Sequence, residues 1–166
     1  MNITIRLALP ADIPDIVNVV TQSFETLFKD ILPDKYFAET NAKYPALFNF
    51  ITNENTTHYV VQKDNIIIGV TCIMPPQDED IGDNCYEFHG LHLHPDYFGQ
   101  SIDITTMNLI FDLIRNLGKT SICVWVYDKN IHFIELYEKC GFVADGKTKT
   151  FDAGEILDAY RMKKNL

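Results

Sequence analysis

Three segments decide the fold that we predict for this chain: residues 85–94 (CYEFHGLHLH), 101–117 (SIDITTMNLIFDLIRNL) and 121–126 (SICVWV). The first and last segments are apolar strands, and the middle segment is apolar on nearly every side, as a largely buried helix is. A strand-helix-strand unit requires its two strands to run parallel, with a right-handed connection, inside a mixed sheet. Gly90 predicts a β-bulge or a close backbone approach within the first strand.

The segments on either side extend this unit. Residues 3–7 alternate like a half-buried strand, and Asp12 is placed to cap an amphipathic helix that ends near Phe28. A weaker helical region after Pro33 carries apolar residues at helical spacing. Further strands are predicted at 58–63 and 66–74, joined by a hairpin at Asp64-Asn65, and as a pair within 142–163, with a helix at 130–140. The element order predicts an α/β fold.

Length and composition predict one globular domain over residues 1–166. The net charge of −9 and the short apolar runs argue against a nucleic-acid or membrane partner. The N-terminal residues do not form a secretory signal, so we expect a cytoplasmic protein. The four cysteines lie in or beside apolar stretches and are widely spaced, which predicts buried thiols and no structural zinc site. They are Cys72, Cys85, Cys123 and Cys140.

Three motifs follow one another along the chain: EFHGLHLHP at 87–95, YFGQSID at 97–103, and Asn130 followed by LYEKCGF at 136–142. Together with the element order, they resemble the GNAT superfamily of acetyl-CoA-dependent N-acetyltransferases over essentially the whole chain. The resemblance implies a single-domain fold with a mixed, mostly antiparallel sheet flanked by helices. It also implies a parallel strand pair around a cofactor cleft, and acetyl-CoA as the acyl donor.

In that family, a glycine-rich turn at the start of a helix binds the pyrophosphate of coenzyme A, which suits the free N–H groups of a helix N-terminus. The matching residues here are Phe98, Gly99, Gln100, Ser101, Ile102 and Asp103. The turn is degenerate, because Phe98, Ser101 and Asp103 replace a polar residue and two glycines. A carboxylate about 5 Å from a phosphate is repelled by roughly 3 kcal/mol at an effective dielectric constant near 20. Alternatively, Ser101 caps the helix and Asp103 complements its dipole.

The resemblance assigns two further residues to the cofactor and the leaving group. Tyr137 matches the tyrosine that protonates the departing thiolate, and a phenol near the sulfur suits this role. Asn130 matches a residue whose side chain contacts the cofactor arm. Backbone groups around Leu91, His92 and Leu93 are implied to bind the pantetheine arm and to polarise the thioester carbonyl.

An alkylamine is mostly protonated near pH 7 and must lose a proton before it attacks. Glu87 lies where many relatives carry a carboxylate that accepts this proton, and alternation places His89 on the same strand face unless a bulge at Gly90 intervenes. Either side chain can serve as the base, and we favour Glu87. A metal site formed by Glu87 with His89, His92 and His94 is disfavoured because no further ligand completes the set.

The sequence therefore predicts transfer of an acetyl group from acetyl-CoA to a primary amine by direct attack. The alternative is a catalytically impaired GNAT-fold protein that acts as a binding or regulatory module. A small molecule or a peptide remains open as the amine acceptor, including polyamines, amino acids and aminoglycosides. The acidic segment 77–84 either attracts a cationic acceptor or is simply a solvated loop. Family members are often dimers, so a homodimer also remains open.

Overall fold

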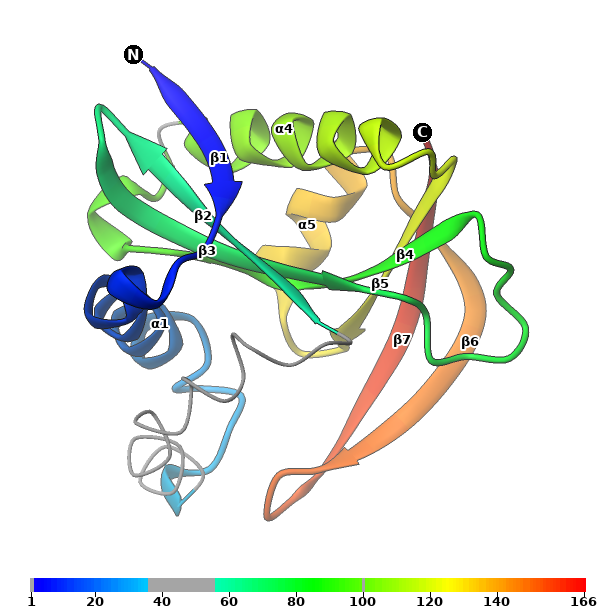
Figure 1. The fold of residues 1–166 in the computed structure, drawn as a ribbon. Coiled ribbons are helices and arrows are strands. Elements are labelled where there is room, and N and C mark those ends of the chain that lie inside the picture. Colours follow the sequence, from blue (N-terminus) through cyan, green and yellow to red (C-terminus); the bar gives the residue numbers. More distant parts are fainter. Residues whose placement is uncertain (1, 36–55, 100) are drawn as a thin grey trace.

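The computed structural model describes residues 2–35, 56–99 and 101–166, which form a seven-stranded sheet flanked by helices (Figure 1). The strand order is β1-β2-β3-β4-β5-β7-β6, and every neighbouring pair is antiparallel except the parallel pair β4–β5. This confirms the predicted mixed, mostly antiparallel α/β fold. The strands are β1 Ile3–Leu7, β2 Thr57–Lys63, β3 Ile66–Met74, β4 Cys85–Leu93, β5 Ser121–Tyr127, β6 Val143–Asp152 and β7 Ile156–Asn165.

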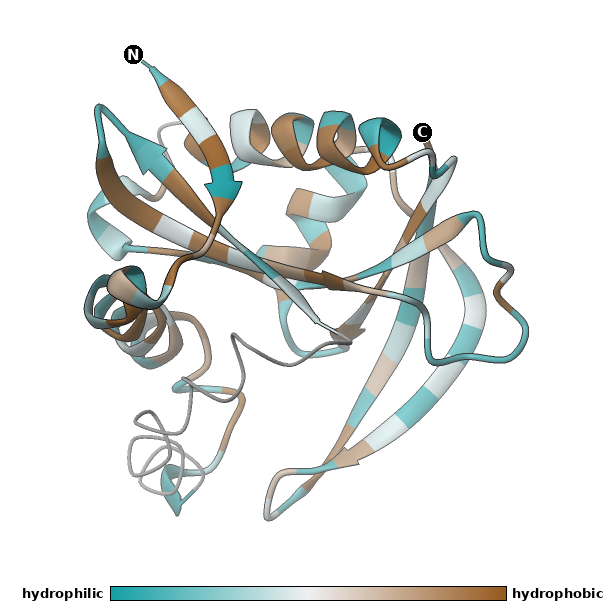
Figure 2. Ribbon diagram, in the orientation of Figure 1, coloured by the Kyte–Doolittle hydropathy of each residue, from teal (hydrophilic) through white to brown (hydrophobic). Residues whose placement is uncertain are grey.

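The helices cover both faces of the sheet. Alternation along β2 places Val60 in a cluster with α1 and Val61 in a second cluster with α4. Figure 2 shows hydrophobic residues concentrated in the central strands, whereas the β3–β4 connector and β6 are mostly hydrophilic. The predicted helical region with Tyr44, Leu47, Phe48 and Ile51 lies outside the described residues. The helices whose full bounds fall within the described residues are α1 Ile13–Leu27, α4 Ile102–Asn116 and α5 Ile131–Lys139, with 3-10 turns η1 Pro10–Asp12 and η3 Pro95–Tyr97.

Two predictions about the helix environments need correction. The carboxylate of Asp12 does not cap α1, because it accepts hydrogen bonds from the guanidinium of Arg6 at 2.7 and 2.9 Å and from the Leu9 N–H at 2.8 Å. The helix that was predicted to be largely buried is amphipathic instead. Its inner face carries Met107 and Ile110, while Leu117, just after its end, is 45% exposed. Since α4 lies on the outside of the sheet, only one of its faces has a partner (Figure 1).

The parallel strands β4 and β5 pair at three positions and then diverge. The last pair joins Glu87 to Cys123, and beyond it β4 continues alongside β3 alone. The register of β3 against β4 shifts between Thr71 and Ile73, close to Gly90, whose φ of +90° favours glycine. The predicted bulge at Gly90 is therefore confirmed, and it lies where the two strands part.

Three of the four cysteines are buried, as predicted, while Cys140 is only partly buried; all four are free thiols. Among the described residues, no helix has the length and apolar character needed to cross a bilayer.

The acidic segment 77–84 is largely exposed, but two of its four carboxylates, those of Asp78 and Asp80, are held in ion pairs. Arg161 of β7, whose side chain is 3% exposed, pairs with Asp78 at 2.9 Å, with Asp80 at 2.8 Å and with Asp145 at 2.7 Å. Asp78 also accepts a hydrogen bond from the indole N–H of Trp125 at 3.1 Å. These contacts fasten the β3–β4 connector to β5 and to the β6–β7 hairpin. We call Arg161, Asp78, Asp80 and Asp145 the Arg161 cluster.

Arg161→Met should destabilise the protein by about 2 kcal/mol. Removing one partner of a fully buried ion pair costs roughly 3–5 kcal/mol, and the partial exposure of these carboxylates reduces that cost. The free energy of unfolding in urea measures the effect. Arg115→Met removes the exposed Arg115–Asp112 pair of α4 and is the matched control, with an expected loss below about 1 kcal/mol. Equal losses in the two variants would contradict a structural role for the Arg161 cluster.

The same comparison should depend on pH. The hydrogen bonds from Arg161 hold the pKa of Asp80 well below the ordinary aspartate value of 3.8. A depressed pKa contributes stability that is present above the ordinary value and is lost as the pH falls toward the folded-state value. The difference in unfolding free energy between the wild type and Arg161→Met should therefore shrink below about pH 4.

Candidate active site

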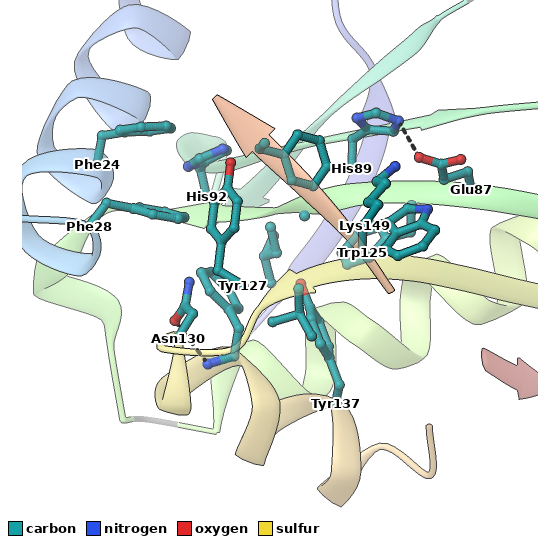
Figure 3. A pocket seen from close by; sticks show the side chains of 16 residues that line it. Phe24, Phe28, Glu87, His89, His92, Trp125, Tyr127, Asn130, Tyr137 and Lys149 are labelled. Carbon is teal, nitrogen blue, oxygen red and sulfur yellow. Dashed lines mark hydrogen bonds and ion pairs between the residues drawn. The ribbon is translucent and has the colours of Figure 1, made fainter. Parts of the chain in front are cut away.

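A pocket of about 250 Å³ opens where β4 and β5 diverge (Figure 3). Side chains reach it from α1, β4, β5, α5 and β6, so no single segment of the chain forms it. It brings together six residues that the sequence marked out as candidates, namely Glu87, His89, Leu91, His92, Asn130 and Tyr137. The other lining residues are Phe24, Phe28, Phe88, Gly90, Trp125, Val126, Tyr127, Phe133, Lys149 and Phe151.

Glu87 and His89 form a hydrogen-bonded pair in this pocket. The Nε2 atom of His89 lies 2.9 Å from Oε1 of Glu87, so the bulge at Gly90 leaves both side chains on one strand face. The carboxylate is buried, and it also accepts a hydrogen bond from the Gln77 N–H at 3.3 Å. Burial raises the pKa of Glu87, but the hydrogen bond from His89 and nearby positive charge outweigh it, so the pKa lies below its ordinary value. Glu87 is thus a carboxylate at neutral pH.

Tyr137 enters the pocket from α5, opposite the Glu87–His89 pair (Figure 3). Its ring is held by Phe88 of β4 at 6.0 Å, by Phe133 at 5.7 Å and by Phe142 at 5.4 Å between ring centroids. This burial raises the pKa of the Tyr137 phenol above its ordinary value of 10.0. The side chain therefore stays protonated and can donate a hydrogen bond.

Asn130 is buried at the N-cap of α5. Its Oδ1 atom accepts a hydrogen bond from the Phe133 N–H at 3.4 Å, and the side chain lines the pocket. The structure thus gives Asn130 a capping task that the sequence did not indicate. Because Oδ1 is used at the helix, the amide nitrogen is the end that faces the pocket (Figure 3).

The pocket continues into a narrow cleft of about 10 Å³ beside the turn before α4. Leu91 and Phe133 line both spaces, and Leu93, Phe98, Gly99 and Asp103 line the cleft. Phe98 faces His132 of α5 across it, with ring centroids 6.0 Å apart. Of the other predicted turn residues, Ile102 is buried in the core, Ser101 is exposed and Gln100 lies outside the described residues.

The backbone of this turn suits an anion better than its side chains do. Gly99 and Ser101 both have positive φ, at +69° and +58°, and Ser101 makes no side-chain hydrogen bond to the helix that it precedes. Helical hydrogen bonding begins with the Thr105 N–H, so the amides before it point out of the helix end. One of them is occupied, since the Ile104 N–H donates to Oδ1 of Asp103 at 2.8 Å. Asp103 therefore uses a position that an anionic ligand would share.

His92 in β4 and His94 just after the strand have different partners. His92 stacks on Phe24 of α1 at 5.4 Å between ring centroids and lies 3.4 Å from the Ser23 hydroxyl, and burial lowers its pKa to about 4. His94 lies 3.6 Å from the carboxylate of Asp96. Within the described ranges, no three His, Cys, Asp or Glu side chains gather in a way that could hold a metal ion.

Sequence reasoning missed most of the pocket wall. Phe24 and Phe28 of α1 stack at 4.6 Å, and Tyr127 contacts both Phe28 and Phe151 edge-on. Lys149 of β6 places its Nζ atom 4.0 Å from the centroid of the Trp125 ring. These residues belong to no local motif, because their shared feature is that the sheet and α1 bring them to one place.

Three solved structures share the fold over nearly their whole length. The PaiA N-acetyltransferase of Thermoplasma acidophilum, crystallised with coenzyme A, aligns with 100% of both chains at 21% identity and a TM-score of 0.79. The spermidine/spermine N-acetyltransferase SpeG of Vibrio cholerae aligns over 99% of this chain and 95% of its own, at 24% identity and a TM-score of 0.67. A GNAT-family acetyltransferase of Streptococcus pneumoniae aligns over 99% of each chain at 17% identity, also with a TM-score of 0.67.

No curated protein matches the sequence significantly. The model of the acetyltransferase (GNAT) family, however, matches residues 24–142, which extend from the last turn of α1 to just past the end of α5. They include Glu87, the turn before α4 and Tyr137. The match covers well over half of the chain, and the divergence of β4 and β5 agrees with it. The chain therefore belongs to the acetyltransferase (GNAT) family.

Proposed function

We propose that residues 1–166 act as one N-acetyltransferase domain that moves the acetyl group of acetyl-CoA to a primary amine by direct attack. The observation that carries this proposal is the pocket itself. It holds a buried carboxylate bonded to an imidazole on one side and a protonated phenol on the other, at the point where β4 and β5 part. Acetyl-CoA, when bound, supplies the thioester that the amine attacks. We also expect the protein to work in the cytoplasm.

Glu87 is the proposed base, with His89 as its partner. The carboxylate stays ionised because its pKa is lowered, and the imidazole bonded to it faces the pocket. A carboxylate with a lowered pKa is a weak proton acceptor alone, so the imidazole hydrogen-bonded to it is the second group that can take the amine proton. The amine proton therefore passes to the Glu87–His89 pair, where the carboxylate of Glu87 balances the positive charge that the proton brings.

Tyr137 is the proposed acid. A raised pKa makes the phenol a weaker acid, but it keeps the proton in place until the sulfur becomes negative. Its hydrogen bond then stabilises the leaving thiolate, which can take the proton. Asn130 and the β4 backbone at Leu91, His92 and Leu93 are proposed to hold the arm of the cofactor in the opening between the strands.

The backbone of the turn before α4 is suited to bind the diphosphate of coenzyme A, whereas the carboxylate of Asp103 in the same turn repels it. Two left-handed residues and the free amides of a helix N-terminus form an anion-binding concavity. Asp103 places a carboxylate in the same narrow cleft. This observation favours the second candidate, a GNAT-fold protein with weak or no acetyl-CoA binding that serves a binding or regulatory role.

Titration with acetyl-CoA, followed by an assay of coenzyme A release with a panel of amines, separates the two candidates. The enzyme should bind acetyl-CoA below millimolar concentration and release coenzyme A only when an amine is present. Absence of binding at millimolar acetyl-CoA would leave only the binding module.

Tyr137→Phe should lower kcat about 10- to 100-fold and leave the affinity for acetyl-CoA nearly unchanged, because the variant keeps the ring and loses the proton donor. Steady-state kinetics and calorimetric titration measure the two quantities. Tyr97→Phe on the η3 turn, outside the pocket, is the matched control. Unaltered turnover in Tyr137→Phe would remove this tyrosine from the mechanism.

Glu87→Gln and His89→Gln should each lower kcat/KM about 10- to 100-fold, and the double variant should be little worse than either single variant, since the two groups act as one pair. Glu135→Gln on the exposed side of α5 controls for a general loss of negative charge. Wild-type kinetics in Glu87→Gln at every pH would rule out Glu87 as the base.

Asp103→Asn should tighten coenzyme A binding about 3- to 10-fold, because it removes one negative charge from the site. The site is partly open to water, which screens the repulsion from roughly 3 kcal/mol to roughly 1 kcal/mol. The amide oxygen of asparagine can still accept the Ile104 N–H. Asp112→Asn, in the C-terminal half of α4, is the control for net charge. Equal affinities in Asp103→Asn and the wild type would show that this carboxylate turns away from the phosphates.

A further inference from the structure

Lys149 brings a positive charge into the pocket that the protein itself does not neutralise with an ion pair. Its Nζ atom lies 4.0 Å from the centroid of the Trp125 ring and 4.8 Å from that of Phe151. Throughout residues 2–35, 56–99 and 101–166, Lys149 forms no ion pair. Lys147, two residues earlier on β6, pairs with Asp80 at 3.2 Å instead. Contact with aromatic rings stabilises an ammonium by about 0.5–2 kcal/mol and leaves its outer side able to bind an anion.

Glu87 is the one acid among the described residues that line the pocket, and His89 already occupies one of its oxygens. Lys149 is not within ion-pair distance of Glu87, yet it is close enough to contribute to the lowered pKa of that carboxylate. Figure 3 shows the lysine side chain beside Trp125, on the side of the pocket that carries His89 and Glu87. The pocket thus offers a cation, Lys149, and a separate proton acceptor, the Glu87–His89 pair. These two groups suit a small molecule that carries an anionic group and an amine close together.

The remaining walls are apolar. Phe24, Phe28, Tyr127 and Phe151 contribute rings to the pocket. A second cavity of about 200 Å³ shares Phe24, His89, Gly90 and His92 with it and is otherwise mostly apolar. Its other lining residues are Ile16, Val20, His58, Val70, Thr71 and Cys72. A pocket of about 250 Å³ is below the size that drug-sized ligands occupy, which favours a small acceptor with an apolar body.

We propose that the acceptor is an α-amino acid with an apolar side chain, whose carboxylate pairs with Lys149 while its amine faces Glu87 and His89. The inference rests on the proposed function and names its substrate class. The reaction forms an amide bond between the amine nitrogen and the acetyl carbon and breaks the carbon–sulfur bond of the thioester. One proton of the ammonium group goes to the Glu87–His89 pair. The thiolate leaves as a thiol by taking the phenol proton of Tyr137, and the second proton that the nitrogen loses restores that phenol.

A polyamine is a poorer match for these walls. Its second ammonium group requires a further carboxylate, and Lys149 repels a cation in the same space. Asp78 and Asp80 of the nearby connector do not supply that carboxylate, because Arg161 binds both. The net negative charge of the chain therefore does not indicate which charges an acceptor meets inside the pocket.

The protein contains one tryptophan, and it is the residue beneath Lys149. Trp125 fluorescence thus reports binding in the pocket without any need for turnover. L-phenylalanine should change this fluorescence in the presence of coenzyme A, and phenylalaninamide and phenethylamine, which lack the carboxylate, should bind at least tenfold more weakly. In Lys149→Met the preference for L-phenylalanine over phenylalaninamide should disappear, whereas Lys147→Met should keep it.

Coenzyme A release gives the second measurement. The kcat/KM for L-phenylalanine should fall at least tenfold in Lys149→Met, chiefly through KM, and the value for phenylalaninamide should stay within about twofold. Lys149→Arg should retain part of the activity because it keeps the cation.

The outcomes separate this inference from the proposed function. Faster acetylation of spermidine or phenethylamine than of apolar amino acids would overturn the inference but would still support the proposed acetyltransferase activity. Binding of L-phenylalanine that depends on Lys149, without any coenzyme A release, would support the inferred site and contradict the proposed catalysis. Equal fluorescence titrations in Lys149→Met and the wild type would overturn the role of Lys149 in either case.

Discussion

The parting of β4 and β5 is the constraint on which the rest of this structure depends. Parallel strands joined by a helix normally continue side by side, but here pairing ends after Glu87 and Cys123. The bulge at Gly90 turns β4 away, and the rings of Phe88, Phe133 and Tyr137 pack at the opening. Backbone groups on the inner edges of the two strands are thereby available to a ligand, since a strand that has lost its neighbour needs other hydrogen-bond partners.

Charged groups outside the pocket fix the position of one of its aromatic walls. Arg161 gathers carboxylates from the β3–β4 connector and from β6, and one of them, Asp78, binds the indole of Trp125. The indole in turn lies beneath Lys149. A buried cation in β7 therefore orients an aromatic wall of the pocket, so the Arg161 cluster joins the stability of the sheet to the shape of the site.

The amides of the turn before α4 can serve two purposes: they can bind a carboxylate that stabilises the helix, or they can bind a phosphate. A helix N-terminus is stabilised by a nearby carboxylate, and Asp103 meets that need through the Ile104 N–H. The same amides are the feature through which such a turn binds phosphate. The carboxylate of Asp103 accepts the Ile104 N–H, so under the proposed function a diphosphate at this turn competes with that carboxylate. On that proposal, coenzyme A binds more weakly than the backbone geometry of the turn alone implies.

The sequence by itself determined the order of the elements, the parallel pair, the bulge and the family, because periodicity, glycine positions and short motifs are local properties. It also marked out Glu87 and Tyr137, which lie in recognisable segments. Only the tertiary structure decided that Glu87 and His89 are hydrogen-bonded, that Asp12 binds Arg6 instead of capping α1, and that Arg161 binds Asp78 and Asp80 of the acidic connector. Phe24, Trp125 and Lys149 meet in one pocket although more than 100 residues separate the first from the last. Such contacts depend on how the sheet twists and which helix covers it, and no local pattern encodes them.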